Sequence, residues 1–182
     1  NETLTNRISL SPEQVEEAKE QKDLLLSLIK PELSACLDVQ VKHWLQGSYK
    51  NHTLIRPVRK GDEFDIDIGI YLLCNAEVKG MSALDAKGAT RNVLDWFASA
   101  RPDTKLEASK TSCERLSYPA SFHIDVPIYY FDENTRICRL ATQENTWIDS
   151  DPKALQDWFY KSVSHLTMEY LSQLRRIIKY IK

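Results

Sequence analysis

Residues 64–73 show the clearest strand pattern in the chain, with apolar side chains at every second position. A period of two is the signature of a β-strand with one buried face and one open face. Asp65 and Asp67 lie two positions apart, so both carboxylates project from the open face of the predicted strand. The pattern therefore predicts a sheet with a buried apolar side and an acidic side.

A second alternating stretch covers residues 122–130 and carries Asp125 between Ile124 and Val126. If the two strands are neighbours in one sheet, their three carboxylates converge on a single point. Like charges this close repel one another unless a cation lies between them, and hard oxygen ligands favour Mg²⁺ or Mn²⁺. The competing interpretation of each acid is a solvated position on the open side of a strand, where acidic residues are common.

Gly47 and Ser48 follow a strand predicted over residues 39–45 and suit a turn from strand to helix. A glycine there permits a close approach of the backbone, and a serine hydroxyl with free amides can hold phosphate groups. The pair predicts a phosphate-binding turn, although a Gly-Ser dipeptide by itself usually marks an ordinary turn.

Helix signals flank these strands. The hydroxyl of Ser11 begins the first helix, which runs toward residue 29, and Pro31 marks its end. Further helices are predicted over residues 82–100, from residue 151 onward and over residues 165–182. The chain therefore combines helices with strands.

We expect the chain to divide into a lobe over residues 1–150 and the beginning of a helical lobe over residues 151–182. The last helix carries an apolar stripe at helical spacing, yet it runs to Lys182 without a cap, Gly or Pro. We therefore expect a truncated chain whose last helix continues into a second lobe. Trp158, at helical spacing after Asp151, is expected to pack in the core.

Composition narrows the function classes. The formal net charge is −2, which argues against tight nonspecific binding to nucleic acid, because such binding depends on an excess of Lys and Arg. No apolar run approaches the roughly 20 residues that cross a bilayer, and no signal-peptide pattern opens the chain. The four cysteines form no CxxC pair, which predicts reduced, buried thiols in a cytoplasmic protein.

The order of the three motifs carries a family resemblance. A Gly-Ser turn, an acidic pair on a strand and a hydrophobic-Asp-hydrophobic strand resemble the polymerase-β-like nucleotidyltransferase superfamily. Residues 46–57 (QGSYKNHTLIRP) and 64–72 (FDIDIGIYL) are similar to the bacterial cGAS/DncV-like nucleotidyltransferases (CD-NTases) of anti-phage CBASS operons. Residues 122–127 (FHIDVP) resemble the third-carboxylate strand of that family, and residues 147–152 (WIDSDP) resemble the segment that leads into its helical lobe.

The resemblance implies a fold and a metal site. The expected fold is α+β, with a mixed central sheet flanked by helices, followed by the start of a truncated helical C-terminal lobe. Asp65 and Asp67 would bind the metal ions and bridge them to a triphosphate. Asp125 would complete the ion that lowers the pKa of the acceptor hydroxyl, and the ions would be Mg²⁺ or Mn²⁺.

The resemblance also implies substrates and partners. Ser48, with Gly47 before it, would grip the donor phosphates, and Lys179 is the candidate basic contact to the triphosphate. The enzyme would join nucleoside triphosphates (ATP or GTP, with UTP or CTP as further candidates) into a cyclic di- or trinucleotide second messenger. It would need neither a membrane nor a nucleic acid, and CBASS effector or helper proteins would be its partners.

Two other functions fit the same residues. One keeps the fold and changes the acceptor, so that nucleotides are added to RNA or AMP is transferred to a protein hydroxyl. The other is a non-catalytic nucleotide-binding module. The presence of all three carboxylates speaks against that last interpretation.

Overall fold

The computed structural model describes residues 8–57, 59, 63–119 and 121–182. The helices in this part of the chain are α2 (Pro12–Leu37), α3 (Gly47–Lys50), α4 (Ala76–Lys79), α5 (Ala83–Ser99), α6 (Pro152–Val163) and α7 (Met168–Ile181). The strands are β1 (Gln40–Gln46), β2 (Phe64–Leu73), β3 (Lys105–Leu106), β4 (Glu114–Tyr118), β5 (Phe122–Val126), β6 (Ile128–Phe131), β7 (Cys138–Ala141) and β8 (Trp147–Asp149). One sheet combined with helices confirms the predicted α+β class.

All eight strands form one mixed sheet with β2 at its centre. β1 pairs antiparallel along one edge of β2, while β5 and then β6 pair parallel along the other edge. β4 and β7 continue the sheet beyond β5 and β6, and β3 and β8 lie outside them. β2 is therefore paired on both sides, and its side chains can point only to the two faces of the sheet.

Pro127 divides the predicted strand over residues 122–130 into β5 and β6. Proline lacks the N–H that a ladder bond needs, but its carbonyl still accepts a bond from the Ile70 amide at 2.9 Å. Both halves keep the same register on β2, as the pairs Asp67–Asp125 and Ile70–Ile128 show. The strand prediction is right in position and wrong in its continuity.

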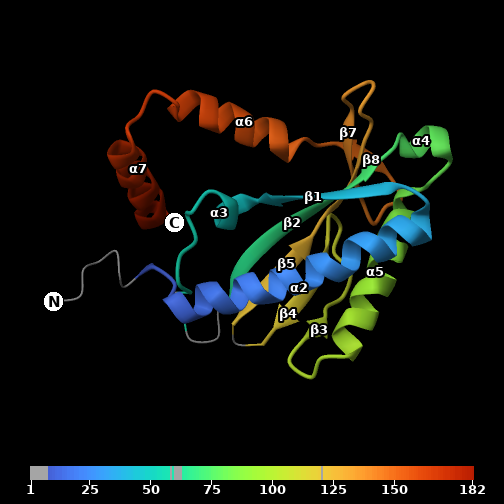
Figure 1. The fold of residues 1–182 in the computed structure, drawn as a ribbon, viewed down its shortest axis with the longest axis horizontal. Coiled ribbons are helices and arrows are strands. Elements are labelled where there is room, and N and C mark those ends of the chain that lie inside the picture. The colour runs from blue at the N-terminus through green and yellow to red at the C-terminus, as the bar shows by residue number, and fades with distance from the viewer. Residues whose placement is uncertain (1–7, 58, 60–62, 120) are drawn as a thin grey trace.

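One face of the sheet is covered by α2 and α5, which also pack against each other (Figure 1). The side chains of Ile66, Ile68 and Ile70 point to this covered face and are buried. Asp65 and Asp67 therefore point to the opposite face. The alternation in the sequence thus predicted correctly which side of β2 is packed and which is open.

α2 begins as predicted and ends later than predicted. The Ser11 hydroxyl accepts from the Gln14 amide at 3.3 Å, and the Gln14 side chain accepts in return from the Ser11 amide at 2.9 Å. Pro31, however, lies inside the helix, which continues to Leu37. A proline in a helix costs about 3 kcal/mol, but Leu33 beyond it is fully buried, and burying one leucine contributes about 1.5–3 kcal/mol. Packing of the last turns of α2 therefore offsets the cost of the proline.

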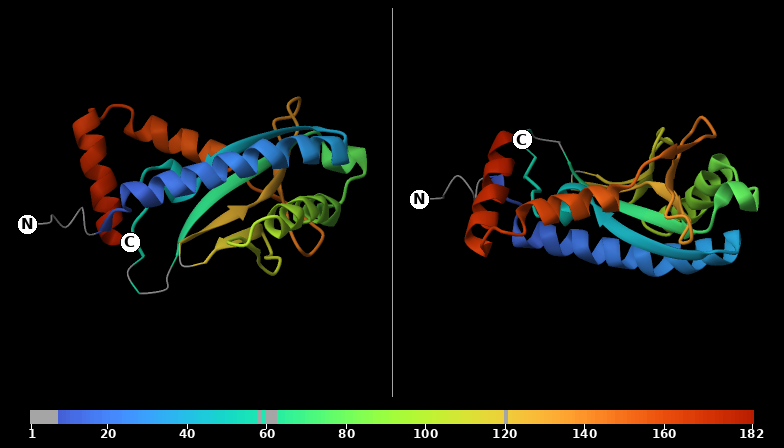
Figure 2. Two further views of the ribbon diagram at one scale, coloured as in Figure 1. Left: turned by 60° about the horizontal axis from the view of Figure 1, so that its bottom comes forward. Right: turned by 90° about the horizontal axis from the view of Figure 1, so that it is seen from above.

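α6 and α7 form a bent pair at the end of the molecule opposite α4 and α5 (Figure 2). α6 contacts β1. Trp158 on α6 is 63% exposed, so the prediction that it packs in the core is wrong. The division into lobes at residue 150 stays a prediction. No helix in the described residues is long and apolar enough to span a membrane.

The cysteines only partly match the expectation of buried thiols. All four are free, and Cys138 is buried, whereas Cys36 is exposed on α2. Cys36 lies near the end of a helix that is covered on one side only. Leu33 is the last buried residue of α2, so Cys36 lies in a final turn that is not covered.

Candidate active site

The three acids meet on the open face of the sheet. β2 and β5 are parallel neighbours, and their register places Asp67 directly opposite Asp125 and Asp65 opposite His123. Side chains of paired residues lie on the same face, so all three carboxylates belong to one cluster, as the two strand patterns predict. We call Asp65, Asp67 and Asp125 the carboxylate cluster.

Mutual repulsion and burial act on Asp67 in particular. Its pKa is raised above the ordinary value, first by burial and then by the charges of Asp125 and Asp65. A carboxylate that is buried beside two like charges marks a site where a bound cation would be favourable. Carboxylate oxygens are also the ligands that Mg²⁺ and Mn²⁺ prefer, so the chemistry of the cluster fits a divalent cation.

The cation that contacts the cluster is an arginine that the sequence analysis did not single out. Arg115 lies on β4, opposite Asp125 in the antiparallel pair. Its Nε and Nη2 donate to the two Asp125 oxygens at 2.5 and 2.6 Å, and Nη2 also donates to Asp65 at 2.9 Å. In the described residues, no group of three or more His, Cys, Asp or Glu side chains is arranged to hold a metal ion.

His123 borders the cluster on the side of Asp65. Its Nε2 lies 2.6 Å from Oε2 of Glu63, and its Nδ1 lies 3.5 Å from Oδ1 of Asp65. The Ser117 hydroxyl, one strand further out, donates to the same Glu63 oxygen at 3.5 Å. The sequence contained a signal for His123, because it shares the polar side of the second strand with Asp125.

The Gly47 turn lies against the carboxylate cluster. Gly47 begins α3 with a φ of +61°, which disfavours any residue with a Cβ. A Cβ added there would also stand 2.1 Å from Oδ2 of Asp67. The structure confirms a strand-to-helix turn at which glycine permits close approach, and the approaching group is the Asp67 carboxylate. The phosphate-binding role of Gly47 and Ser48 stays a prediction.

Two hollows adjoin the cluster. A cavity of about 700 Å³ is lined by Ser48 and Asp65 together with Arg56, His123 and Lys182. A second cavity of about 440 Å³ lies under α6, where Gly47, Asp67 and Trp158 line it. The exposed indole of Trp158 thus faces a cavity beside the acids instead of the core.

Of the two lysines near the end of α7, Lys182 lies closer to the cluster. It lines the larger cavity, its Nζ donates to the Thr53 carbonyl at 3.4 Å, and its charge acts to lower the pKa of Asp67. Lys179 is not among the described residues lining either cavity; its charge acts on His52 instead, and burial lowers its own pKa. Its predicted contact with a triphosphate stays a prediction.

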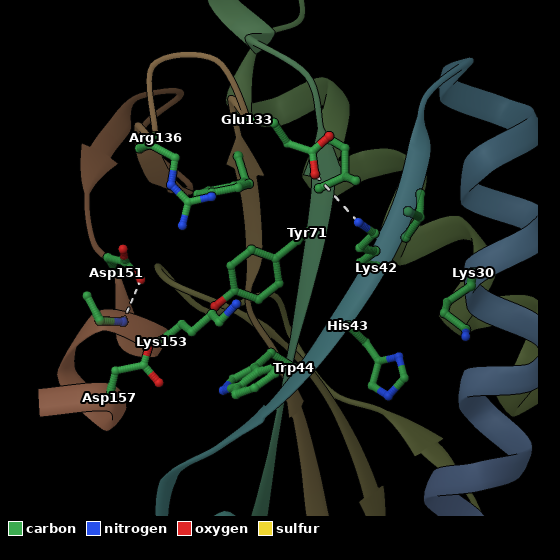
Figure 3. A pocket seen from close by; sticks show the side chains of 14 residues that line it. Lys30, Lys42, His43, Trp44, Tyr71, Glu133, Arg136, Asp151, Lys153 and Asp157 are labelled. Atoms are coloured by element: carbon green, nitrogen blue, oxygen red, sulfur yellow. Dashed lines mark hydrogen bonds and ion pairs between the residues drawn. The ribbon is translucent and has the colours of Figure 1, made fainter. Parts of the chain in front are cut away.

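The same open face holds an aromatic cavity further along β2 (Figure 3). This cavity of about 540 Å³ is walled by Trp44, Tyr71 and Phe131. Charged side chains of both signs line the rest of the cavity: Lys30, Lys42, Arg136 and Lys153 with Glu133, Asp151 and Asp157. Lys153 places its Nζ 4.9 Å from the Trp44 ring centroid. Gln46 stands between this cavity and the carboxylate cluster, because it donates to the Tyr71 hydroxyl at 3.0 Å and pairs with Asp67 across β1 and β2.

Comparisons with known proteins show which family this chain resembles. Residues 41–129 match the family described as Cyclic GMP-AMP synthase DncV-like, nucleotidyltransferase domain. A cyclic GMP-AMP synthase from Escherichia albertii is 40% identical over 183 residues, which are 99% of this chain and 40% of the relative. A cyclic GMP-AMP synthase from Vibrio cholerae serotype O1 is 27% identical over 196 residues, which are 80% of this chain and 42% of the relative. A c-di-GMP synthase from Roseivirga ehrenbergii is 28% identical over 139 residues, which are 73% of this chain and 35% of the relative.

Solved structures share the fold. A variant of the Vibrio cholerae di-nucleotide cyclase DncV, in complex with ATP, GTP and 5MTHFGLU2, superposes with a TM-score of 0.84 at 19% identity. The match covers 100% of this chain and 65% of that one. DncV with the linear intermediate 5′ pppA(3′,5′)pG gives a TM-score of 0.77 at 19% identity, covering 100% of this chain and 64% of that one.

The family match and the shared fold together define a nucleotidyltransferase domain. This domain, centred on residues 41–129, belongs to the DncV-like family, the bacterial relatives of cGAS. The chain spans 40% and 42% of the length of the first two curated relatives. The resemblance read from the three sequence motifs is confirmed.

Proposed function

We propose that this protein joins nucleoside triphosphates into a cyclic dinucleotide. The observation that carries the proposal is the carboxylate cluster on two paired parallel strands, with the Gly47 turn packed directly against it. The names of the relatives support it, since they are cyclic GMP-AMP synthases and a c-di-GMP synthase. DncV structures that contain ATP, GTP or a linear intermediate support nucleoside triphosphates as the substrates.

In this proposal the acceptor hydroxyl oxygen attacks the α-phosphorus of a triphosphate. The bond to pyrophosphate breaks, pyrophosphate leaves, and the hydroxyl proton passes to solvent. A second transfer within the linear product closes the ring. Asp65, Asp67 and Asp125 would hold divalent cations, Mg²⁺ or Mn²⁺, which neutralise charge on the phosphates and acidify the hydroxyl when bound.

The chain's own groups position the reactants. Ser48 and Lys182 line the cavity beside Asp65 and would contact a triphosphate there. The cavity beside Asp67 and Trp158 would take the other nucleotide, with its base against the indole. Two hollows on either side of one carboxylate cluster suit a reaction between two nucleotides.

The decisive test is product analysis. We would incubate the full protein with the four nucleoside triphosphates and Mg²⁺ or Mn²⁺, add phosphatase, and identify resistant products by mass spectrometry, with an Asp125→Asn control. We expect a cyclic dinucleotide that the control does not make. Labelled RNA or labelled protein would instead favour the tailing or AMP-transfer function, and nucleotide binding without turnover would favour a non-catalytic module.

The wider context of the activity follows from the same proposal. The nucleotide product would act as a second messenger in anti-phage defence in the cytoplasm, with a CBASS effector as the partner that senses it. Residues 1–150 would form the catalytic lobe, and residues 151–182 would begin a helical lobe. Deletion of the gene from a defended strain, followed by phage challenge, tests the defence role.

We also propose that the aromatic cavity binds a regulatory ligand with a flat ring and an anionic part. Trp44 and Tyr71 offer ring faces, and Lys153 and Arg136 offer positive charge at the cavity. The DncV structure with ATP, GTP and 5MTHFGLU2 holds a third molecule besides two nucleotides, which supports an additional ligand site. A ligand bound in this cavity would affect Asp67 through Gln46, which donates to the Tyr71 hydroxyl and pairs with Asp67.

Titration with 5MTHFGLU2 by calorimetry tests this second proposal. We expect Trp44→Leu to abolish binding, and Trp96→Leu to leave it unchanged, because Trp96 is an exposed tryptophan on α5. Equal binding by both variants would place the ligand elsewhere.

A further inference from the structure

Arg115 lies across the carboxylate cluster like a bound cation. Its guanidinium makes a two-point contact with Asp125 and a third contact with Asp65. The side chains of Arg115 and Asp125 are only 17% and 15% exposed. Planar, two-point contacts of this kind are the strong form of an ion pair and are weakened least by solvent.

These contacts use the oxygens that a metal ion would need. Both oxygens of Asp125 and one oxygen of Asp65 accept from Arg115. Lys182, the other cation that acts on the cluster, contacts the Thr53 carbonyl and influences Asp67 only through its charge. Among the described residues near the acids, Arg115 is therefore the group with which a divalent cation has to compete directly.

We propose that Arg115 and the metal exchange places. In the metal-free protein Arg115 is the counter-ion of Asp65 and Asp125; when a metal–triphosphate complex binds, the acids pass to the metal and Arg115 passes to a phosphate oxygen. The inference rests on the proposed function, because it takes the cluster to be the metal site. It assigns Arg115 a positioning role and a ligand class, the phosphates of a nucleoside triphosphate.

The chemistry of the guanidinium favours such an exchange. Its fork of N–H donors fits a phosphate as well as it fits a carboxylate, so release from Asp125 leaves no donor without an acceptor once the triphosphate is present. Without the triphosphate, a metal ion that displaces Arg115 leaves a largely buried cation unpaired. The structure thus predicts that metal and triphosphate bind cooperatively, each strengthening the other.

The role of Arg115 as the counter-ion of Asp65 and Asp125 is tested without any metal. Thermal unfolding is measured in EDTA for the wild type, Arg115→Met, Arg115→Lys and an Arg139→Met control. Arg139 also contacts two acids, Glu77 and Asp149, both at 2.8 Å, but these acids are exposed. We expect Arg115→Met to lower Tm clearly, Arg115→Lys to lower it less, and Arg139→Met to change it little.

A second substitution separates repulsion from simple loss of packing. Adding Asp125→Asn to Arg115→Met should restore much of the lost Tm, because one of the repelling charges is gone. If the double variant is no more stable than Arg115→Met, Arg115 is not a counter-ion, and this half of the proposal is overturned.

The exchange half is tested with Mn²⁺, whose free concentration is read by electron paramagnetic resonance. Without nucleotide, Arg115→Met should bind Mn²⁺ about ten- to hundredfold more tightly than the wild type, the range expected for removing hydrogen bonds to charged groups. Arg115→Lys keeps the charge but not the two-point contact, so it should gain part of that affinity. If Arg115→Met gains Mn²⁺ affinity and Arg115→Lys gains none, the positive charge at residue 115 alone weakens metal binding. That result would overturn the exchange.

Nucleotide completes the test. A non-hydrolysable triphosphate should tighten Mn²⁺ binding strongly in the wild type and in Arg139→Met, and much less in Arg115→Met. If the triphosphate tightens Mn²⁺ binding equally in the wild type and in both variants, Arg115 does not pass to a phosphate, and this step is overturned. If the wild type binds no Mn²⁺ even with the triphosphate, the proposed metal site itself fails, and that result is distinct from each of the others.

Discussion

Replacing Gly47 by alanine separates backbone strain from a clash at the carboxylate cluster. Gly47 has a φ of +61°, and an added Cβ would stand 2.1 Å from Oδ2 and 3.0 Å from Cγ of Asp67. The left-handed backbone alone costs alanine about 1–2 kcal/mol. Forcing the Asp67 carboxylate aside adds about 1–3 kcal/mol, as overpacking does in a tight site.

Gly80 is a matched control within the same chain. It also has a left-handed φ, of +74°, but an added Cβ there would meet no atom within 4 Å. Gly80→Ala should therefore lower the free energy of unfolding by the backbone contribution alone, about 1–2 kcal/mol. Gly47→Ala should lower it by about 2–5 kcal/mol when urea unfolding is measured in EDTA.

A double-mutant cycle with Asp67→Ala isolates the clash. The Asp67 Cβ would lie 3.6 Å from the new methyl group, which is an ordinary contact, so only the removed atoms collide. The two substitutions should therefore couple by about 1–3 kcal/mol, with the double variant more stable than additivity predicts. A coupling below about 0.5 kcal/mol, or equal losses in Gly47→Ala and Gly80→Ala, would refute the packing of Asp67 against the turn.

Three further predictions concern the scaffold. Pro31→Ala should raise the free energy of unfolding by about 1–3 kcal/mol in urea, because it removes the ring from the interior of α2. A lower free energy of unfolding would show that the proline is needed for packing. Glu114→Gln should lower the free energy of unfolding by about 3–5 kcal/mol, because Lys87, 3% exposed, lies 2.9 Å from Glu114 and would lose its buried partner. A loss near zero would show that water reaches this pair. Burial raises the pKa of the Cys138 thiol to about 12. Iodoacetamide at pH 8 should therefore label exposed Cys36 and leave Cys138 unlabelled until the protein unfolds. Peptide mass spectrometry would measure the labelling of each cysteine. The raised pKa favours the neutral thiol in the folded protein, so its contribution to stability should fall as pH rises from about 9 to about 12; early labelling of Cys138 would contradict its burial.

The sequence predicted the features that depend on local pattern. A period of two is a property of neighbouring residues, so β2 and the facing of Asp65 and Asp67 could be identified without knowledge of the fold. The Ser11 cap is local in the same sense. The pairing of Asp67 with Asp125 is not local, and it was predicted only under the condition that the two strands are neighbours.

The misses depend on packing against distant segments. Pro31 was taken as a helix end because the cost of a proline is visible in sequence, whereas the burial of Leu33 against the sheet is not. Trp158 was assigned to the core because helical spacing does not reveal which face of α6 has a partner. The exposure of Cys36 was missed for a similar reason, because the sequence does not show that burial along α2 ends at Leu33.

Arg115 was missed because it is defined by strand register. Consecutive residues of β4 point to opposite faces, so Glu114 meets Lys87 on the covered face while Arg115 meets Asp125 on the open face. A slip of one residue between β4 and β5 would turn Arg115 toward Lys87 and turn Glu114 toward the carboxylate cluster, placing like charges together on both faces. The two ion pairs therefore fix the same register from opposite sides of the sheet. Because that register is held by electrostatics as well as by packing, the arginine that neutralises the cluster is also part of what keeps β4 correctly aligned beside it.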